Sequence, residues 1–286
     1  MLTKYRCFLL WPIVALLSVS FVRAMAAGAD AADQSPHRIV SFGPTITEKL
    51  YLLGVQDELV GVTTYCERPP EARAKEKIGN VTQVNIEKVV QLKPDLVLAT
   101  PLTGPRTVER LKHLGIRVIV FKDPNSFTEM NEQFLELGRI VDREKRANEI
   151  VGVSEQKVER IMNRVKGLPR PKVFVQIGAR PLFTATRHSF LNDFIEFAGG
   201  TNIAAGAKTG FYSREEVLWQ DPDIIIVVTM GLAAENEKMG WRRFKTINAV
   251  KNNRIFTMDS YKTCSPTPRT FVEALEGMVK VLHSGI

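Results

Sequence analysis

The sequence is poor in the side chains from which metal sites are built. Its 286 residues include three cysteines and four histidines. Two of the histidines, His37 and His283, lie near opposite ends of the chain and outside the predicted strand-end loops. A zinc or manganese site needs several histidines and carboxylates that converge on one ion. The composition therefore argues against a bare metal ion as the ligand of this protein.

The sequence also lacks the motifs of common enzyme classes. It contains no Gly-x-Gly-x-x-Gly after the first predicted strand, no phosphate-binding loop, no His-Glu-x-x-His and no Gly-x-Ser-x-Gly. An α/β fold can still carry catalytic residues that are scattered along the chain, so an enzyme remains the rival class. We predict a protein that is not an enzyme.

Long apolar runs are missing except at the N-terminus. Lys4 and Arg6 precede an almost wholly apolar stretch, residues 8–22, and a small-x-small sequence ending at Ala26 follows. This order predicts a secretory signal peptide, residues 1–26, and hence export to the periplasm after cleavage near Ala26. The run is short for a membrane span, and an uncleaved anchor is the alternative.

No concentrated block of positive charge is present either. The net charge of +8 falls to +5 when the three basic residues of the leader are removed, and acids are interleaved with the remaining basic residues. Nucleic-acid binding needs a basic face. We therefore predict no nucleic-acid partner and interpret the charge as a source of solubility.

The rest of the chain alternates short apolar runs with helical patterns, which predicts parallel sheets covered by helices. We expect an N-terminal α/β lobe in residues 27–125 and a C-terminal α/β lobe in residues 170–286. The expected strands are residues 38–42, 59–63, 95–99, 118–121, 172–177, 223–229 and 254–258. The expected helices are residues 45–53, 85–92, 106–114, 190–198 and 270–283.

Between the lobes, residues 126–169 form a connector without any strand signal. Apolar residues recur at helical spacing, and Asp142 is expected to cap a second helix that ends at Gly167. That helix would have about 24 residues and a length of roughly 36 Å. The predicted fold class is α/β, with two Rossmann-like lobes that are joined by one long helix. Each lobe is expected to be a mainly parallel sheet with flanking helices.

One stretch of the sequence occurs twice. Residues 85–98 match residues 213–226 without gaps at an offset of 128, and each copy begins with a helix-capping residue. Chance similarity of α/β units is one explanation, and duplication of a lobe plan is the one that we favour. Each copy carries a glutamate in its first helical turn, Glu87 or Glu215. A carboxylate in that turn interacts favourably with the positive end of the helix dipole. Alternatively, one carboxylate on each lobe binds arginines of a partner.

Six stretches together resemble the periplasmic binding proteins for iron-siderophore complexes and cobalamin, and the cobalamin-binding branch most closely. They are residues 38–44, 61–70, 85–99, 191–203, 213–228 and 265–269. The resemblance implies two α/β lobes bridged by a long helix, with the ligand in the cleft between them. It implies cobalamin or a related cobalt corrinoid as the ligand and no intrinsic cofactor. A ferric siderophore or haem is the alternative ligand.

The same resemblance implies the partners. In the cobalamin-binding branch, one glutamate of each lobe docks with arginines of the membrane permease, and these positions fall on Glu87 and Glu215. We therefore expect a monomer that delivers its ligand to an ABC permease dimer with its ATPase subunits. Docking then becomes the favoured interpretation of the two glutamates.

The resemblance also implies which loops bind the ligand. Tyr65 and Phe183 match cleft aromatic residues, and Arg269 matches an arginine at the mouth of the second lobe. The tryptophans that line the cleft of the best-known cobalamin binder are absent, so we look to Trp241 and Tyr261 for aromatic surface. The expected ligand-binding residues are Phe42, Pro44, Tyr65, Cys66, Phe183, Trp241, Tyr261 and Arg269.

Cys66 and Cys264 are the cysteines that remain beyond the leader, and both fall in predicted cleft loops. Three interpretations stand beside one another. The two residues form a disulfide, which an exported protein is able to do. They bind a metal or cofactor, or they lie apart as free thiols.

Overall fold

The computed structural model describes residues 35–228 and 232–283. From residue 36 onward they belong to one compact unit, Pro36–Ile286. The predicted leader and its cleavage site lie outside the described residues. No described helix is long and apolar enough to cross a membrane.

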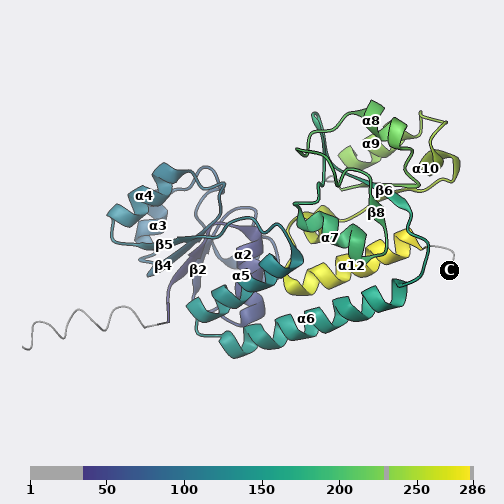
Figure 1. Cartoon of the computed structure of the whole chain (residues 1–286). Coiled ribbons are helices and arrows are strands. Elements are labelled where there is room, and N and C mark those ends of the chain that lie inside the picture. The colour runs from purple at the N-terminus through teal and green to yellow at the C-terminus, as the bar shows by residue number, and fades with distance from the viewer. Residues whose placement is uncertain (1–34, 229–231, 284–286) are drawn as a thin grey trace, which may run out of the picture. The chain divides into compact units, whose positions relative to one another are not determined.

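The N-terminal lobe is built on a sheet of five parallel strands (Figure 1). These are β1 (Ile39–Ser41), β2 (Leu59–Val62), β3 (Glu76–Lys77), β4 (Leu96–Ala99) and β5 (Arg117–Val120), in the spatial order β3-β2-β1-β4-β5. The central strands β1 and β4 are buried along their whole length, as unbroken apolar runs predict for a parallel sheet covered on both faces. The helices of this lobe are α2 (Pro44–Leu53), α3 (Ile86–Gln91), α4 (Pro105–His113) and the short 3-10 helix η2 (Pro70–Ala74).

The C-terminal lobe follows a similar plan with one antiparallel strand, β7. Its strands are β6 (Lys172–Ala179), β7 (Leu182–Thr184), β8 (Thr201–Asn202), β9 (Ile224–Val227) and β10 (Ile255–Thr257). Their order is β10-β9-β6-β7, with β8 also paired to β6. Its helices are α7 (Phe190–Phe197), α8 (Arg214–Gln220), α9 (Leu232–Trp241), α10 (Asn248–Lys251), α11 (Ser260–Cys264) and α12 (Pro268–Leu282).

Two helices that pack against each other connect the lobes, α5 (Phe127–Ile140) and α6 (Glu144–Val165). The 22 residues of α6 extend about 33 Å. Its first turns bury Ala147 in the core of the N-terminal lobe, whereas its later turns bury Val158 and Ile161 in the core of the C-terminal lobe. One helix therefore belongs to both cores, and the predicted long connecting helix is confirmed.

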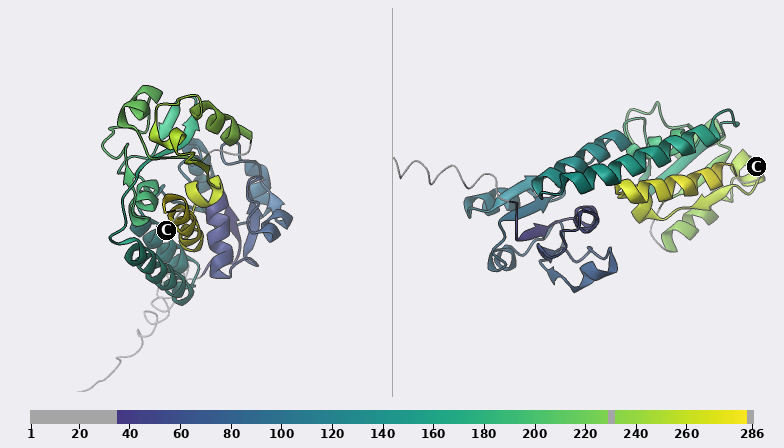
Figure 2. Two further views of the ribbon diagram at one scale, coloured as in Figure 1. Left: turned by 90° about the vertical axis from the view of Figure 1, so that its right-hand side faces the viewer. Right: turned by 90° about the horizontal axis from the view of Figure 1, so that it is seen from below.

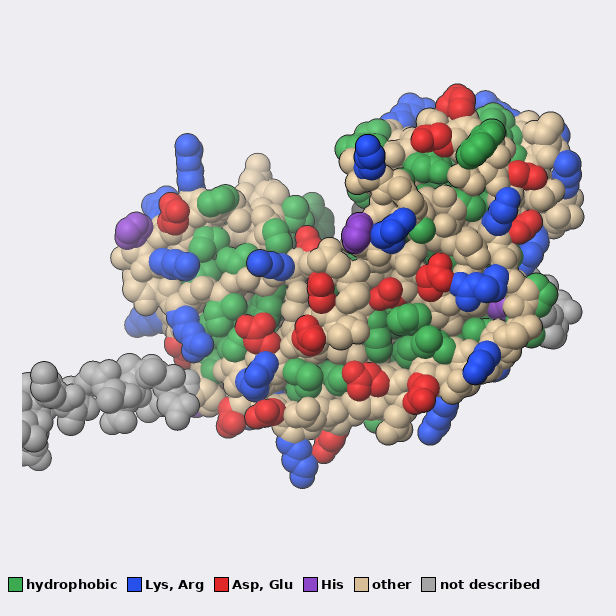
Figure 3. Space-filling view, viewed as in Figure 1, with side chains coloured by type: hydrophobic (Ala, Val, Ile, Leu, Met, Phe, Trp, Pro, Cys, Tyr) green, Lys and Arg blue, Asp and Glu red, His purple; other side chains and the backbone are tan. Residues whose placement is uncertain are grey.

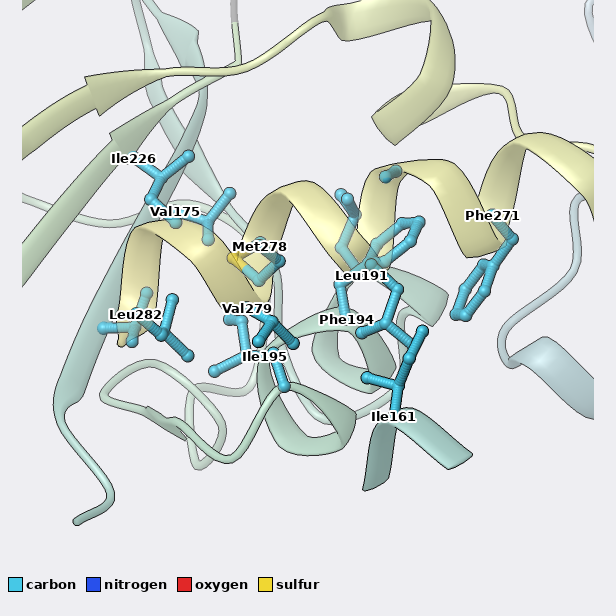
Figure 4. Close-up of a cluster of buried hydrophobic side chains, with 14 of the residues drawn as sticks. Ile161, Val175, Leu191, Phe194, Ile195, Ile226, Phe271, Met278, Val279 and Leu282 are labelled. Carbon is cyan, nitrogen blue, oxygen red and sulfur yellow. The ribbon is translucent and has the colours of Figure 1, made fainter. Parts of the chain in front are cut away.

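Helix α12 runs beside α6 and attaches the C-terminal lobe to the connector (Figure 2). The Ser154 hydroxyl of α6 donates a 2.7 Å hydrogen bond to the carbonyl oxygen of Pro268 at the start of α12. Phe271 of α12 stacks on Phe194 of α7 with 4.1 Å between the ring centroids. Figure 4 shows these rings beside Ile161 of α6. Packing of these apolar side chains fixes α12 between α6 and the second sheet.

The predicted strands and helices lie at their expected positions, and the helices of the repeated stretch are capped by Asn85 and Ser213. The predicted cap of α6 is wrong. Asp142 adopts a φ of 54° before the helix, and Arg143 takes the N-cap position without a side-chain hydrogen bond. The short strands β3, β7 and β8 and the helices α9, α10 and α11 were not predicted. The lobe boundaries at residues 125 and 169 stay predictions.

Candidate functional site

The first wall of the candidate site lies at the carboxyl ends of β1 and β4. These strands are neighbours, and the strand order changes direction between them, because β2 lies on one side of β1 and β4 on the other. Ligands of open α/β sheets bind beyond the carboxyl ends of the strands at such a switch point. The loops that follow the two strands begin at Phe42 and Thr100.

The second wall comes from the C-terminal lobe, and a side-chain contact joins the two walls. The guanidinium of Arg68, in the loop after β2, lies 4.4 Å from the ring centroid of Tyr261, which follows β10. Loops at the carboxyl ends of the two sheets therefore face each other. The space-filling view shows an open hollow between the lobes, which we call the cleft (Figure 3).

Three aromatic side chains are exposed near these strand ends. Tyr65, after β2, is 59% exposed, and Phe183, in β7 beside the carboxyl end of β6, is 38% exposed. Phe211 is 61% exposed and packs edge to face on Phe183, with 5.4 Å between the ring centroids. A Cβ atom on Gly210 would lie 2.3 Å from the Phe183 ring, so this glycine leaves the space that the ring fills. We call Phe183 and Phe211 the aromatic pair.

Three predicted ligand-binding residues of the first wall differ in what they offer a ligand. Pro44 is half-buried in the first turn of α2, a position that suits a residue without an N–H. Phe42 is fully buried in the core of the lobe. The Cys66 thiol is also buried, and its sulfur lies 3.1 Å from the hydroxyl oxygens of Thr47 and Thr63. Neither Phe42 nor Cys66 has exposed surface in this structure, and ligand contacts through their side chains stay predictions.

Trp241, another predicted ligand-binding residue, has its side chain fully buried in the core of the C-terminal lobe, and its ligand contact stays a prediction. Its indole N–H donates a 2.6 Å hydrogen bond to the Gln176 side-chain oxygen, and the Arg214 guanidinium lies 4.5 Å from the indole centroid. Gln176 and Arg214 in turn both donate to Glu237. Burial acts to raise the pKa of Glu237, but these two hydrogen bonds and the positive charges of Arg214 and Arg180 together hold the pKa below its usual value. Trp241 is thus part of a structural network.

Arg269 lies in the first turn of α12. Its side chain is 72% exposed and lies 3.8 Å from Glu273. Together with Glu48 of α2 these residues line a groove of about 690 Å³. Glu48 pairs with Arg68 at 3.4 Å, and burial raises the pKa of Glu48 despite that partner. Arg68 is therefore held between Glu48 and Tyr261.

Both cysteines of the described residues are free thiols, which contradicts a disulfide between them. Cys264 is half-buried, and burial raises the pKa of its thiol to about 11. No group of three or more metal-binding side chains occurs in residues 35–228 and 232–283. The Cys264 thiol thus stays protonated at physiological pH.

A pocket of about 160 Å³ lies where the two walls join. Its lining includes Thr45, Lys49 and Thr100 from the N-terminal lobe and Phe190 and Cys264 from the C-terminal lobe. Lys49 is 7% exposed, and burial lowers the pKa of its ammonium group to about 8. We call this space the Lys49 pocket. No feature of the sequence pattern indicated it, because a lysine in an amphipathic helix is expected on the outer face.

The predicted docking residues are exposed on corresponding helices, Glu87 on α3 and Glu215 on α8. Neither carboxylate has a hydrogen bond or ion pair among the described residues. The neighbouring Glu216 is occupied instead, because it completes the capping box of α8 with Ser213. Trp219, one helical turn after Glu215, is 83% exposed. Figure 1 shows α3 and α8 on opposite sides of the gap between the lobes.

Comparison with known proteins adds a family and several relatives. The sequence matches the periplasmic binding protein family over residues 39–262. YvrC, an uncharacterized ABC transporter substrate-binding lipoprotein of Bacillus subtilis, is 31% identical over 261 residues, which is 87% of this chain and 81% of the relative. The vitamin B12-binding protein of Yersinia pestis is 28% identical over 235 residues, which is 81% of this chain and 82% of the relative. A possible iron-binding periplasmic solute-binding protein of Staphylococcus epidermidis has a TM-score of 0.79 and 30% identity, covering 87% of this chain and 100% of that one.

Proposed function

Because the chain belongs to the family of periplasmic binding proteins, as the substrate-binding component of an ABC importer, we propose that it captures cobalamin or a related corrinoid in the cleft. Its relatives are binding proteins rather than enzymes, so capture needs no covalent chemistry. The ligand is cargo and is released to the permease.

The observation that carries this proposal is the exposed aromatic surface at the strand ends of both lobes. Tyr65 belongs to one wall, and the aromatic pair belongs to the other. The apolar faces of exposed rings at such positions stay in contact with water unless a ligand covers them. A flat corrin ring stacks well on aromatic faces on both sides. Polar groups of the loops are then placed to hydrogen-bond the amides at its edge.

The basic residues support a corrinoid over an anionic ferric siderophore, which would call for several unoccupied arginines in the cleft. Arg68 already pairs with Glu48 and covers Tyr261. Arg187 donates through Nε to the carbonyl oxygen of Ala205. The remaining candidates are Arg106, Arg180 and Arg269, the last of which pairs with Glu273. Too few of these arginines are available to neutralise a highly charged siderophore.

The ligand proposal is tested by calorimetric titration of the purified protein with cyanocobalamin, cobinamide, haem and ferric siderophores. We expect nanomolar binding of a corrinoid and weaker binding of the others. The double variant Phe183→Ala, Phe211→Ala should lose corrinoid affinity roughly 10- to 100-fold, since each ring contributes about 1 kcal/mol or more of contact. Val153→Ala, which removes an exposed apolar side chain of α6, is the matched control. Tight binding of haem or a siderophore without corrinoid binding would overturn the proposal.

We propose that the partner is an ABC permease dimer with its ATPase subunits and that Glu87 and Glu215 dock to it. The support is their exposure, their lack of partners among the described residues and their equivalent positions in the two copies of the repeat. A free carboxylate on each lobe accepts a bidentate, charge-assisted contact from an arginine of the permease.

Charge reversal tests the docking proposal. The double variant Glu87→Arg, Glu215→Arg should abolish uptake by whole cells while corrinoid affinity of the purified protein stays unchanged. The control is Glu132→Arg, Glu159→Arg, which reverses two exposed charges on the connector helices α5 and α6. Normal uptake by the first double variant, or equal loss in the control, contradicts docking through these residues.

We further propose that the protein works as a monomer in the periplasm after cleavage near Ala26. The relatives support this location, since they are periplasmic or lipoprotein binding proteins. N-terminal sequencing of the protein from a periplasmic extract tests the cleavage site. A chain that stays in the membrane fraction with Met1 intact would identify the leader as an anchor.

A further inference from the structure

The Lys49 pocket is a small site that the proposed contacts of the corrin ring do not use. It lies at the switch point of the first sheet, since Thr45 follows β1 and Thr100 follows β4. Its volume of about 160 Å³ is below the roughly 300 Å³ at which pockets for whole drug-sized molecules begin. The pocket therefore has room for one small group of a ligand and not for the whole molecule.

Lys49 is a buried cation without an anion. The side chain is 7% exposed, and its ammonium group has no hydrogen bond or ion pair among the described residues. Burial is the one cause of its lowered pKa, so no nearby carboxylate compensates the charge. The other charged residues of the lining, Lys122 and Asp123, are exposed. At a pKa of about 8 the amine still carries a proton at neutral pH.

Two further features of the lining favour negative charge. The Thr100 hydroxyl oxygen is buried and has no hydrogen-bond partner in the described structure. Thr45 lies in the first turn of α2, where the positive end of the helix dipole attracts anions. Lys49 follows Thr45 by four residues and so lies on the same face of the helix. The ammonium of a largely buried lysine, a buried hydroxyl and a helix N-terminus thus line one small space.

We propose that the Lys49 pocket binds an anionic oxygen group, a phosphate or a carboxylate, that belongs to the molecule held in the cleft. Lys49 is the counter-ion of this group, and Thr100 donates a hydrogen bond to it. The inference rests on the proposed function, because it takes the captured ligand as the source of the anion. Cobalamin supplies a phosphodiester in its nucleotide tail, whereas haem supplies carboxylates.

The first arm of the test compares two corrinoids that differ in the anion. Cyanocobalamin carries the phosphodiester, and cobinamide lacks it. Lys49→Met should weaken calorimetric binding of cyanocobalamin roughly 10- to 100-fold, because a hydrogen bond to a charged group is lost. Binding of cobinamide should change less than about twofold. Thr100→Val should weaken cyanocobalamin binding in the same selective way, and Lys157→Met, which removes an exposed lysine of α6 outside the pocket, should have no effect.

Equal losses for both corrinoids in Lys49→Met and Thr100→Val would overturn the proposal, since the pocket would then only support the cleft. If the wild-type protein binds haem and Lys49→Met binds it more weakly, the carboxylates of haem are identified as the anion.

The second arm works without any corrinoid and separates the two proposals. Thermal unfolding of wild-type protein and Lys49→Met is measured in sodium phosphate and in sodium chloride at equal ionic strength. Phosphate should raise the melting temperature of the wild type more than that of the variant. If no corrinoid binds but this difference is present, the ligand proposal fails and the anion site stands. Equal shifts in both proteins would show a general salt effect and sink the anion site.

Discussion

Replacement of Lys49 by methionine should make the folded protein more stable, although it removes a group that we assign to ligand binding. The pKa of the buried ammonium is about 8, against an ordinary value of 10.5. One pKa unit corresponds to about 1.4 kcal/mol, so the buried charge costs the folded state about 3 kcal/mol at neutral pH. Methionine keeps an unbranched side chain of similar length and a high helix propensity, and it carries no charge.

The pH dependence of this effect has a definite sign. The folded-state pKa of Lys49 lies below its ordinary value, so the unfolded chain binds more protons between pH 8 and 10.5. The contribution of Lys49 to stability therefore rises with pH across that interval. Below it both states are charged and the full cost is present, whereas above it both are neutral and the cost is gone. The advantage of Lys49→Met should thus shrink in alkaline buffer.

Urea unfolding at pH 7 and pH 10 measures the free energy of unfolding of both proteins. For a protein of this size, about 3 kcal/mol corresponds to a rise in melting temperature of roughly 6–12 °C. Lys157→Met, which removes an exposed lysine of α6, is the control and should stay within about 0.5 kcal/mol of the wild type. The reasoning would be refuted if Lys49→Met is no more stable than the wild type, or if its gain in free energy of unfolding is the same at pH 7 and pH 10. The ammonium would then have a partner in the folded state, and the case for an anion site would fall with it.

Three further substitutions test the packing around the site. Gly210→Ala should displace the Phe183 ring, because the new Cβ atom would lie 2.3 Å from that ring. Corrinoid affinity should fall about tenfold with little loss of stability. Unchanged affinity in a calorimetric titration would argue against the aromatic pair. Trp241→Phe should cost about 1–3 kcal/mol in urea unfolding, because the Gln176 oxygen loses its buried donor. Ser154→Ala should cost about 1–2 kcal/mol, because the Pro268 carbonyl loses its partner on α6; a loss below about 0.5 kcal/mol would mean that water replaces the hydroxyl.

The elements that the sequence predicts well are those whose signal is local. The unbroken apolar run of β4 predicts a strand buried on both faces, and that strand lies at the centre of the first sheet. The caps Asn85 and Ser213 predict helix starts because their side chains bond to backbone N–H groups three residues later. Asp142 has the same capping chemistry but lies one residue too early, in a left-handed turn. Capping potential alone does not decide which residue begins the helix.

The parts of the site that were missed depend on contacts between distant residues. Trp241 is aromatic in either environment, and its place in the core depends on tertiary contacts such as the hydrogen bond to Gln176 and the ring contact with Phe174. Phe211 pairs with Phe183 across a short backbone bridge that no periodic pattern announces. Lys49 looks like an ordinary surface residue of α2, but it is 7% exposed and lines a pocket together with Phe190 and Cys264 of the C-terminal lobe. Burial by another lobe leaves no signal in the local sequence.

The two tryptophans of the described residues differ in exposure, so their fluorescence reports separately on two parts of the protein. The third tryptophan of the chain, Trp11, falls within the predicted leader. Trp219 is 83% exposed beside a proposed docking residue, whereas Trp241 is fully buried in a lobe core. Iodide should therefore quench the red-shifted emission of the first indole and leave the blue-shifted emission of the second. Contact with a permease would shield the quenchable fraction alone, so one fluorescence spectrum could follow docking while reporting that the lobe stays folded.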